Sequence, residues 1–390
     1  MRRALEILGN LTLTLLSLAV LAVVLEFVVF RYILVPDGLL RNVTINQVVR
    51  YEPNTRAVFR HPDQTQSVVT INAQGWNSRL PYYETDKIPG RMRIAIVGDS
   101  YVHGAFVNVE QGFPAIIERQ LQAKGYHAEV YRFGMDGAPL SQYLHVLRRE
   151  VVQYRPDIVV VPLIHNDFDE SYRLLKTRYA SSFMKLRRAA GGNILEVQPT
   201  DFDGGWPDRA RASAVFRYLY SETGLTLMAK RWISRYFSGG AEDWDPNFVR
   251  SAVDVRKIRD HRSNRAIARY VLREMKALSR RHNFKLVIAM DAVREAIYAR
   301  KSPDQYEVGV LNTIAAELTA ELELPFVDLQ EVFRRDFAVN GQRFEFEFDW
   351  HWNVRGNELA GRAIARLIED QVGHAMPADT ALIQTRAVAQ

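Results

Sequence analysis

The sequence predicts an α/β protein, a three-layer α/β/α sandwich with a mainly parallel sheet, preceded by one N-terminal transmembrane helix. Three observations predict it. Short apolar runs alternate with segments of helical apolar spacing from residue 91 onward. The run from Ile158 to Ile164 is continuously apolar, which is typical of a parallel strand covered on both faces. A long apolar segment near the N-terminus stands apart from this alternation.

The composition excludes several classes of protein. The chain has 390 residues, of which 47% are hydrophobic and 25% charged, so it can bury a full core. The net charge of +6 is spread along the chain without dense basic blocks, so no nucleic-acid partner is implied. The absence of cysteine excludes disulfides, thiol catalysis and cysteine-bound zinc.

Residues 1–35 are interpreted as a retained transmembrane signal anchor. The stretch Leu11 to Phe30 would span roughly 30 Å as a helix, the thickness of a bilayer core. Its apolar character continues to Val35, further than in a cleaved signal peptide. Arg2 and Arg3 favour an N-terminus inside, whereas Arg31 weakens that bias. We expect a single-pass protein of the bacterial inner membrane with its globular part in the periplasm or outside; a buried helix of a soluble protein is the alternative.

The rest of the chain divides into three regions. Residues 36–90 contain turn signals and a strand near Val68 to Asn72, which predicts a connecting region with a small β extension. Residues 91–372 form the main domain, and residues 373–390 a flexible tail without a clear pattern. Within the domain, a basic and aromatic-rich segment at about 168–258 interrupts the alternation as an insertion. Insertions beside a strand end form a lid or a substrate wall, or only decorate the surface.

Strands alternating with helices indicate parallel pairing with right-handed crossovers. The expected strands are Arg93 to Gly98, His127 to Phe133, Asp157 to Ile164, Lys285 to Met290 and Pro325 to Asp328. The expected helices are Phe113 to Leu121, Leu140 to Tyr154, Ala214 to Tyr220, Thr226 to Phe237, Asn264 to His282, Val308 to Leu322 and Val354 to Ile368.

Polar residues follow several of these strands, at the sheet edge where α/β proteins place their chemistry. They are Gly98-Asp99-Ser100 after the first strand, Gly134-Met135-Asp136-Gly137 after the second, His165-Asn166-Asp167 after the third, and Asp349-Trp350-His351-Trp352 before the last helix. Glycine, aspartate and serine also form ordinary turns, so each group alone says little.

In this order, the four groups resemble the motifs of the SGNH, or GDSL, hydrolase superfamily over roughly residues 93–370. The resemblance implies a flavodoxin-like fold, a triad of Ser100, His351 and Asp349, and an oxyanion hole formed by Ser100, Gly137 and Asn166. An aspartate two residues before the histidine, with a tryptophan after it, is similar to the variant in bacterial membrane-linked members, including relatives of polysaccharide O-acetyltransferases.

The sequence also departs from the family pattern at two positions. Ile164 stands where a glycine is frequent, and Arg132 where many members have asparagine. These differences leave the triad intact, but they do not allow the substrate to be inferred from the family pattern.

The chemistry requires these residue types. A serine hydroxyl needs a neighbouring base to take its proton, a role for His351, while Asp349 would hold the imidazole in the required tautomer. The backbone N–H groups of Ser100 and Gly137 and the Asn166 amide would bind the oxyanion. No cofactor and no metal are needed for this reaction.

Other interpretations of the same residues remain open. Gly137 is also a plausible turn glycine, Asn166 a loop cap, and His351 a core histidine between two tryptophans. Asp99 is expected to shape the turn rather than react. His103 and His165 are expected to be polar loop residues, or with His351 to form a metal site.

Three functions follow. The first is a membrane-anchored esterase that cleaves an O-acyl, especially O-acetyl, ester through an acyl-enzyme on Ser100. The second is an O-acyltransferase that uses the same residues to modify a cell-envelope glycan; the anchor, the variant aspartate–histidine spacing and the aromatic-rich insertion favour it. The third is a non-catalytic, membrane-tethered binding protein. The expected partners are an acylated small molecule or glycan and the membrane; the sequence identifies no protein partner.

Overall fold

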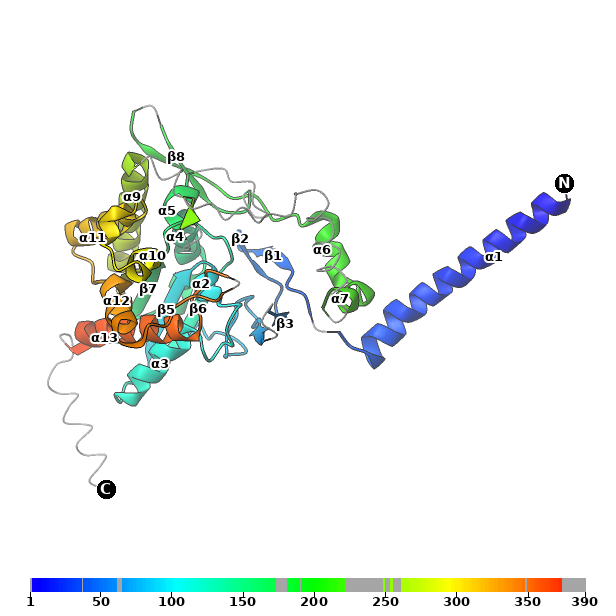
Figure 1. The fold of residues 1–390 in the computed structure, drawn as a ribbon, viewed down its shortest axis with the longest axis horizontal. Coiled ribbons are helices and arrows are strands. Elements are labelled where there is room, and N and C mark those ends of the chain that lie inside the picture. Colours follow the sequence, from blue (N-terminus) through cyan, green and yellow to red (C-terminus); the bar gives the residue numbers. More distant parts are fainter. Residues whose placement is uncertain are drawn as a thin grey trace, which may run out of the picture.

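The computed structural model describes residues 2–36, 38–61, 65–172, 181–189, 191–221, 248–249, 253–254, 261–347 and 349–373. A five-stranded sheet forms the centre (Figure 1). Its strands, in spatial order, are β6 (Ala128–Gly134), β5 (Met92–Gly98), β7 (Ile158–Leu163), β12 (Lys285–Met290) and β13 (Phe326–Asp328). All neighbouring pairs are parallel. In chain order this is the 2-1-3-4-5 arrangement of flavodoxin-like sheets, which confirms the predicted fold class.

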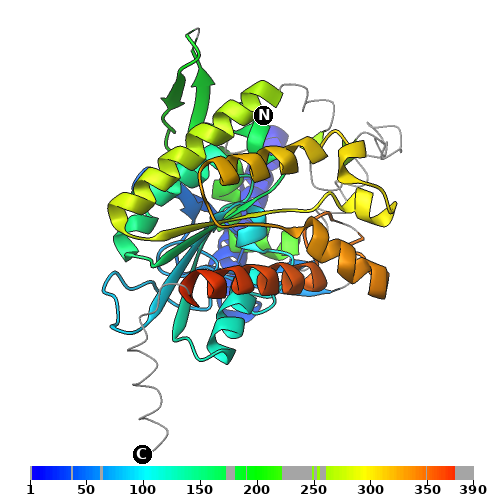
Figure 2. The ribbon, with the colours of Figure 1, turned by 90° about the vertical axis from the view of Figure 1, so that its left-hand side faces the viewer.

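Helices cover both faces of the sheet (Figure 2). One face carries α4 (Leu140–Arg149), α9 (His261–His282) and α11 (Gly309–Glu321), and the other α3 (Phe113–Ala123), α12 (Leu329–Asn340) and α13 (Val354–Gly373). Side chains alternate along β5. Ala95 and Val97 pack in the core under α4, α9 and α11, and Ile94 and Ile96 pack in the core under α3, α12 and α13. Because both faces are covered, every residue of β7 is buried, as its apolar run predicts.

Two sequence predictions for the helices need correction. The expected helix Leu140 to Tyr154 is divided into α4 and the 3-10 turn η2 (Val151–Tyr154). Between them, Glu150 leaves helical geometry at a φ of −122°, and its buried carboxylate pairs with Arg50 at 2.8 Å. Helix α12 was not expected, although Asp328 caps its start and Gly341 ends it at a φ of +63°.

The short elements of the domain are α2 (Ser100–His103), α5 (Asp167–Glu170), α10 (Arg294–Tyr298) and η4 (Pro303–Gln305). The insertion contains the hairpin of β8 (Lys185–Arg188) and β9 (Ile194–Val197), helices α6 (Gly205–Ala212) and α7 (Ala214–Ser221), and the pair β10 (Phe248–Val249) and β11 (Val253–Asp254). Helix α7 agrees with the helix expected from Ala214 to Tyr220. The helix expected from Thr226 to Phe237 lies outside the described residues, as does the tail after Gly373.

Two antiparallel hairpins form the region before the domain. They are β1 (Asn42–Ile45) with β2 (Val48–Tyr51), and β3 (Arg56–Arg60) with β4 (Gln66–Thr70). Val48 and Val69 are buried in the same core as α4. The ion pair of Arg50 with Glu150 joins β2 to the end of α4. The β extension therefore leans on the sheet domain, while the exact domain boundaries stay a prediction.

The N-terminal helix projects away from the sheet (Figure 1). It consists of α1 (Arg2–Val24) and a π-helical continuation, η1 (Leu25–Ile33). Among the described residues, one helix is long and apolar enough to cross a membrane, Glu6–Ile33, and its most apolar stretch is unburied. This fits a single-pass anchor or a signal sequence; the orientation stays a prediction.

Candidate active site

Ser100 lies at the carboxyl end of the central strand β5. The strand ends at Gly98, and the next residue, Asp99, caps α2 by accepting a hydrogen bond from the Tyr101 N–H at 2.9 Å. A Cβ at position 98 would lie 2.4 Å from Val102 Cγ2, so the turn requires glycine there. Asp99 therefore shapes the turn that presents Ser100, as expected.

The structure brings Ser100, His351 and Asp349 together. Ser100 Oγ lies 2.7 Å from His351 Nε2, although the two residues are 251 positions apart in the chain. His351 Nδ1 is hydrogen-bonded to Asp349 Oδ1, which also accepts the His351 backbone N–H at 2.8 Å. With the proton on Nδ1, the Nε2 atom is free to accept the serine proton. The order of contacts is serine, imidazole, carboxylate.

His351 is not a core histidine. Its side chain is 17% exposed, and two aromatic rings contact it. The rings of Phe106 and Tyr101 both have centroids 4.9 Å from the imidazole, the first stacked and the second tilted. These contacts fix the plane of the imidazole beside Ser100.

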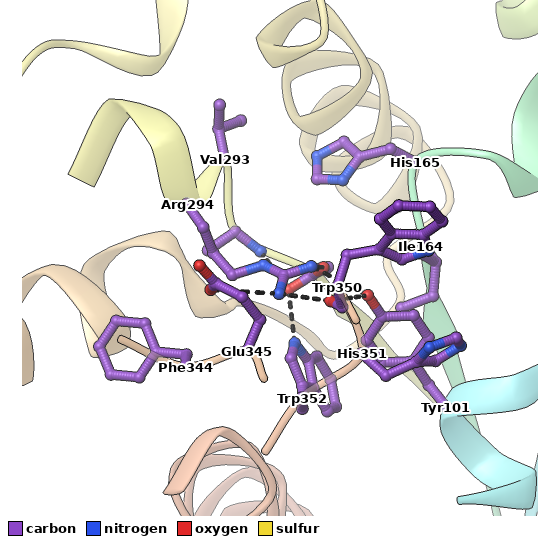
Figure 3. Close-up of polar contacts among 12 residues, drawn as sticks. Tyr101, Ile164, His165, Val293, Arg294, Phe344, Glu345, Trp350, His351 and Trp352 are labelled. Atoms are coloured by element: carbon purple, nitrogen blue, oxygen red, sulfur yellow. Dashed lines mark hydrogen bonds and ion pairs between the residues drawn. The ribbon is translucent and has the colours of Figure 1, made fainter. Parts of the chain in front are cut away.

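A buried polar network holds the loop that carries Asp349 and His351 (Figure 3). Arg294 is fully buried; it donates to the Trp350 carbonyl at 2.6 Å and to the Tyr101 hydroxyl at 2.9 Å. It also pairs with Asp291 at 3.4 Å and Glu345 at 3.5 Å. Burial alone would lower the pKa of Arg294, but the neighbouring tyrosine and carboxylates raise it above its ordinary value. The guanidinium therefore stays charged.

Trp352 ties the same loop to the sheet, because its Nε1–H donates to Asp291 Oδ1 at 2.9 Å. Asp291 follows β12 directly, at the same sheet edge as Ser100. Sequence reasoning missed both Asp291 and Arg294. The available signal was a carboxylate immediately after a buried strand, at the end of Lys285 to Met290.

The two other predicted oxyanion residues follow the strands on either side of β5. Gly137 comes after β6 and Asn166 after β7, and these strands are the direct neighbours of β5. Gly137 has a φ of +67°, a conformation that favours glycine. The Asn166 side chain hydrogen-bonds the Glu170 carboxylate. Since an amide nitrogen carries two hydrogens, this contact orients Asn166 and leaves one N–H for another acceptor.

Two histidines of the sequence motifs have partners of their own. His103 is buried, with Nδ1 2.6 Å from Asp136 Oδ1 and 3.0 Å from the Tyr51 hydroxyl. His165 is buried with Nε2 2.9 Å from Asn312 Oδ1, and burial lowers its pKa. His165 lies in the loop after β7, as expected, whereas His103 lies in helix α2. In the part of the chain that the structure describes, no group of three potential metal ligands is close enough for a metal site.

Arg132, a departure from the family pattern, supports the serine turn. Its guanidinium is buried and donates to the carbonyls of Val102 at 2.7 Å and His103 at 2.9 Å, at the end of α2. Burial lowers the pKa of Arg132 to about 10. The residue therefore satisfies the last carbonyls of the helix that begins with Ser100.

Three buried or largely buried carboxyls lie around the serine turn and the Asn166 loop. Burial raises the pKa of Asp99 to about 7 and, together with the charge of Asp169, that of Glu170 to about 7. Burial, and then the charge of Asp99, raises the pKa of Asp167 well above its ordinary value. Asp167 accepts hydrogen bonds from the Tyr143 hydroxyl and the Ile164 N–H, each at 2.7 Å. Each of these pKa shifts favours the protonated form of the carboxyl.

Comparison with known proteins gives two family matches. The model of GDSL-like lipases and acylhydrolases matches residues 94–198. The model of the SGNH hydrolase-like domain of the acetyltransferase AlgX matches residues 248–390. No curated protein sequence matches the chain.

Solved structures with a similar arrangement include three esterases or acylhydrolases. A catalytic variant of an acetylxylan esterase from Geobacillus stearothermophilus is 14% identical, with 73% of this chain and 96% of that chain covered and a TM-score of 0.39. A lipase/acylhydrolase from Enterococcus faecalis is 16% identical, with 72% and 96% covered and a TM-score of 0.38. The acetyl xylan esterase AlAXEase is 13% identical, with 72% and 100% covered and a TM-score of 0.38.

Each family match covers part of the candidate site. The first contains Ser100, Gly137 and Asn166, and the second contains Asp349 and His351. Both matches therefore support the SGNH/GDSL hydrolase superfamily that the four sequence motifs resemble.

Proposed function

We propose that this protein is a serine esterase that cleaves an O-acyl ester, with acetyl as the preferred acyl group, through an acyl-enzyme on Ser100. The observation that carries the proposal is the 2.7 Å contact between Ser100 Oγ and His351 Nε2, with Asp349 on the opposite ring nitrogen. A serine in this arrangement has the adjacent, oriented base that nucleophilic catalysis requires.

In the first half-reaction, Ser100 Oγ attacks the ester carbonyl carbon while His351 Nε2 takes the hydroxyl proton. The carbonyl oxygen becomes an oxyanion, which the N–H groups of Ser100 and Gly137 and the Asn166 amide are proposed to bind; one such donor contributes about 3 kcal/mol. When the intermediate collapses, the bond to the leaving alcohol breaks and His351 gives that alcohol its proton. The acyl group then remains on Ser100.

In the second half-reaction, water attacks the acyl-enzyme, with His351 taking a proton from it and returning one to Ser100. Asp349 stays ionised throughout and stabilises the imidazolium that forms in each half. The net result is one acid and one alcohol from one ester and one water.

A second candidate is transfer of the acyl group to a glycan hydroxyl in place of water. The match to the domain of an acetyltransferase favours it, because that match includes Asp349, His351 and Trp352. Trp350, which stands between Asp349 and His351 in the sequence, is 39% exposed. A partly exposed indole in the loop of Asp349 and His351 would suit the apolar face of a sugar ring.

The full chain in detergent, incubated with p-nitrophenyl acetate, tests the proposal. We expect p-nitrophenol release by wild type, its loss in Ser100→Ala, and its retention in Ser302→Ala, a control at an exposed serine. Mass spectrometry of added polysaccharide then separates the candidates: free acetate alone indicates hydrolysis, and acetylated glycan indicates transfer. A folded wild type that neither releases p-nitrophenol nor acetylates glycan would contradict both candidates and support the third function, a non-catalytic binding protein.

A further inference from the structure

The N-terminal helix makes a specific contact with the insertion. Glu26, in η1, accepts hydrogen bonds from the Ser213 hydroxyl at 2.7 Å and from the N–H groups of Ala214 at 2.9 Å and Val215 at 3.0 Å. These donors lie at the start of α7, where N–H groups have no partner within their own helix. A carboxylate from the anchor, 187 residues earlier in the chain, therefore caps α7.

The position of Glu26 along the anchor defines the depth of this contact relative to the membrane. The run from Ile7 to Leu25 has 19 residues and no charge, so it fits the hydrocarbon core better than the stretch Leu11 to Phe30, which contains Glu26. As a helix it is about 28 Å long, close to the roughly 30 Å of a bilayer hydrocarbon core. Glu26 then falls at the boundary of the core, and the remainder of η1 lies at the level of the lipid headgroups. Helix α7 is capped at that same level.

The side chains at this end of the molecule suit a membrane interface. Trp206 in α6 is 75% exposed, and Tyr220 in α7 is 42% exposed. Tyr218 of α7 packs on Phe30 of the anchor, with ring centroids 4.6 Å apart. Tryptophan and tyrosine concentrate at the headgroup level of membranes because one side of each ring system is apolar and the other polar.

Charge and position agree with this interpretation. Arg31, which pairs with Glu26 at 3.2 Å, is 43% exposed in its side chain, and Arg209 of α6 is exposed. Figure 1 shows α6 and α7 beside the end of the N-terminal helix, on the side of the molecule facing it. An anionic headgroup layer would attract both arginines.

We propose that α6 and α7 form a second membrane contact: they lie on the headgroup layer of the leaflet where the anchor ends, fixed to the anchor by Glu26. The occupant of this exposed aromatic face is the lipid surface. The sheet domain is then held at the membrane by two joined elements rather than by one helix and a loop.

The absence of cysteine from the chain allows a direct test. Single variants Trp206→Cys and Tyr220→Cys, labelled with the fluorophore NBD, are reconstituted as full chains in phosphatidylcholine–phosphatidylglycerol vesicles. Leu18→Cys, within the proposed span, is the positive control. Val339→Cys, at an 84% exposed apolar residue, is the negative control, because its helix α12 lies far from the anchor (Figure 1). Vesicles with and without spin-labelled lipid then report contact with the bilayer.

We expect spin-labelled lipid to quench the labels at positions 206 and 220 at least twofold and to leave position 339 unquenched. Labels at 206 and 220 that behave like the label at 339 would overturn the proposal. So would a blue-shifted but unquenched label, because protein would then cover this face. Adding Glu26→Ala to Trp206→Cys should halve the quenching without changing that of Leu18→Cys; unchanged quenching would overturn the role of Glu26.

Discussion

Replacement of Arg294 by methionine should damage both the stability and the activity of the protein. The guanidinium is fully buried and faces two carboxylates, Asp291 at 3.4 Å and Glu345 at 3.5 Å. It also supplies a donor to the Trp350 carbonyl at 2.6 Å. Removing one partner of a buried ion pair costs about 3–5 kcal/mol, because the remaining charge has no compensation. We expect Arg294→Met to lose about that much free energy of unfolding.

Urea denaturation followed by tryptophan fluorescence measures this loss. Arg155→Met is the matched control, because Arg155 makes an exposed ion pair with Asp86, for which we expect less than about 1 kcal/mol. Under conditions where Arg294→Met is folded, its kcat should fall, since the Trp350 carbonyl lies between Asp349 and His351. A stability within about 1 kcal/mol of wild type, together with unchanged kcat, would refute this account of the network.

Three further predictions concern the residues around Ser100. Asp349→Asn should lower kcat about 10³- to 10⁴-fold, because an amide favours the wrong imidazole tautomer; ester hydrolysis measures it, and a loss below tenfold would contradict the role. Gly137→Ala should lower the free energy of unfolding by about 1 kcal/mol, because its φ is +67°, and should also lower kcat. Gly125→Ala is the control: its φ is +88° and its surroundings are equally open, so it should lose similar stability without loss of activity. Burial raises the pKa of Asp99 to about 7. The native state therefore holds a proton that the unfolded state loses near pH 4, and stability from this group, on the order of a few kcal/mol, should be lost as pH rises through 7. Urea denaturation at pH 5 and pH 8 should show less of this decline in Asp99→Asn; an unchanged decline would exclude Asp99 as its source.

Local patterns predicted most of the fold. The apolar run of β7 is continuous because both faces of the strand are buried, and this property is visible in the sequence itself. The 2-1-3-4-5 strand order was implied only through the family resemblance, since no local pattern states which strand pairs with which. Helix α12 was missed although its signals were present: Leu329, Val332, Phe333 and Phe337 follow helical spacing, and Asp328 caps its start.

The proposed catalytic residues were predictable because each lies in a short motif at the end of a strand or before a helix. The network behind them was not. Arg294 contacts Tyr101 across 193 positions, and Glu26 contacts Ser213 across 187. Single residues at such separations carry no periodic signal, so only the folded chain shows that one positions a loop and the other caps a helix.

The central claim is that Ser100 is a nucleophile activated by His351. The most direct test is labelling of the folded full chain with a fluorescent organophosphonate, which reacts with an activated serine. We predict labelling of wild type and of Ser302→Ala, and no labelling of Ser100→Ala or His351→Ala. A folded wild type that stays unlabelled, or a Ser100→Ala variant that is labelled as strongly as wild type, would contradict it.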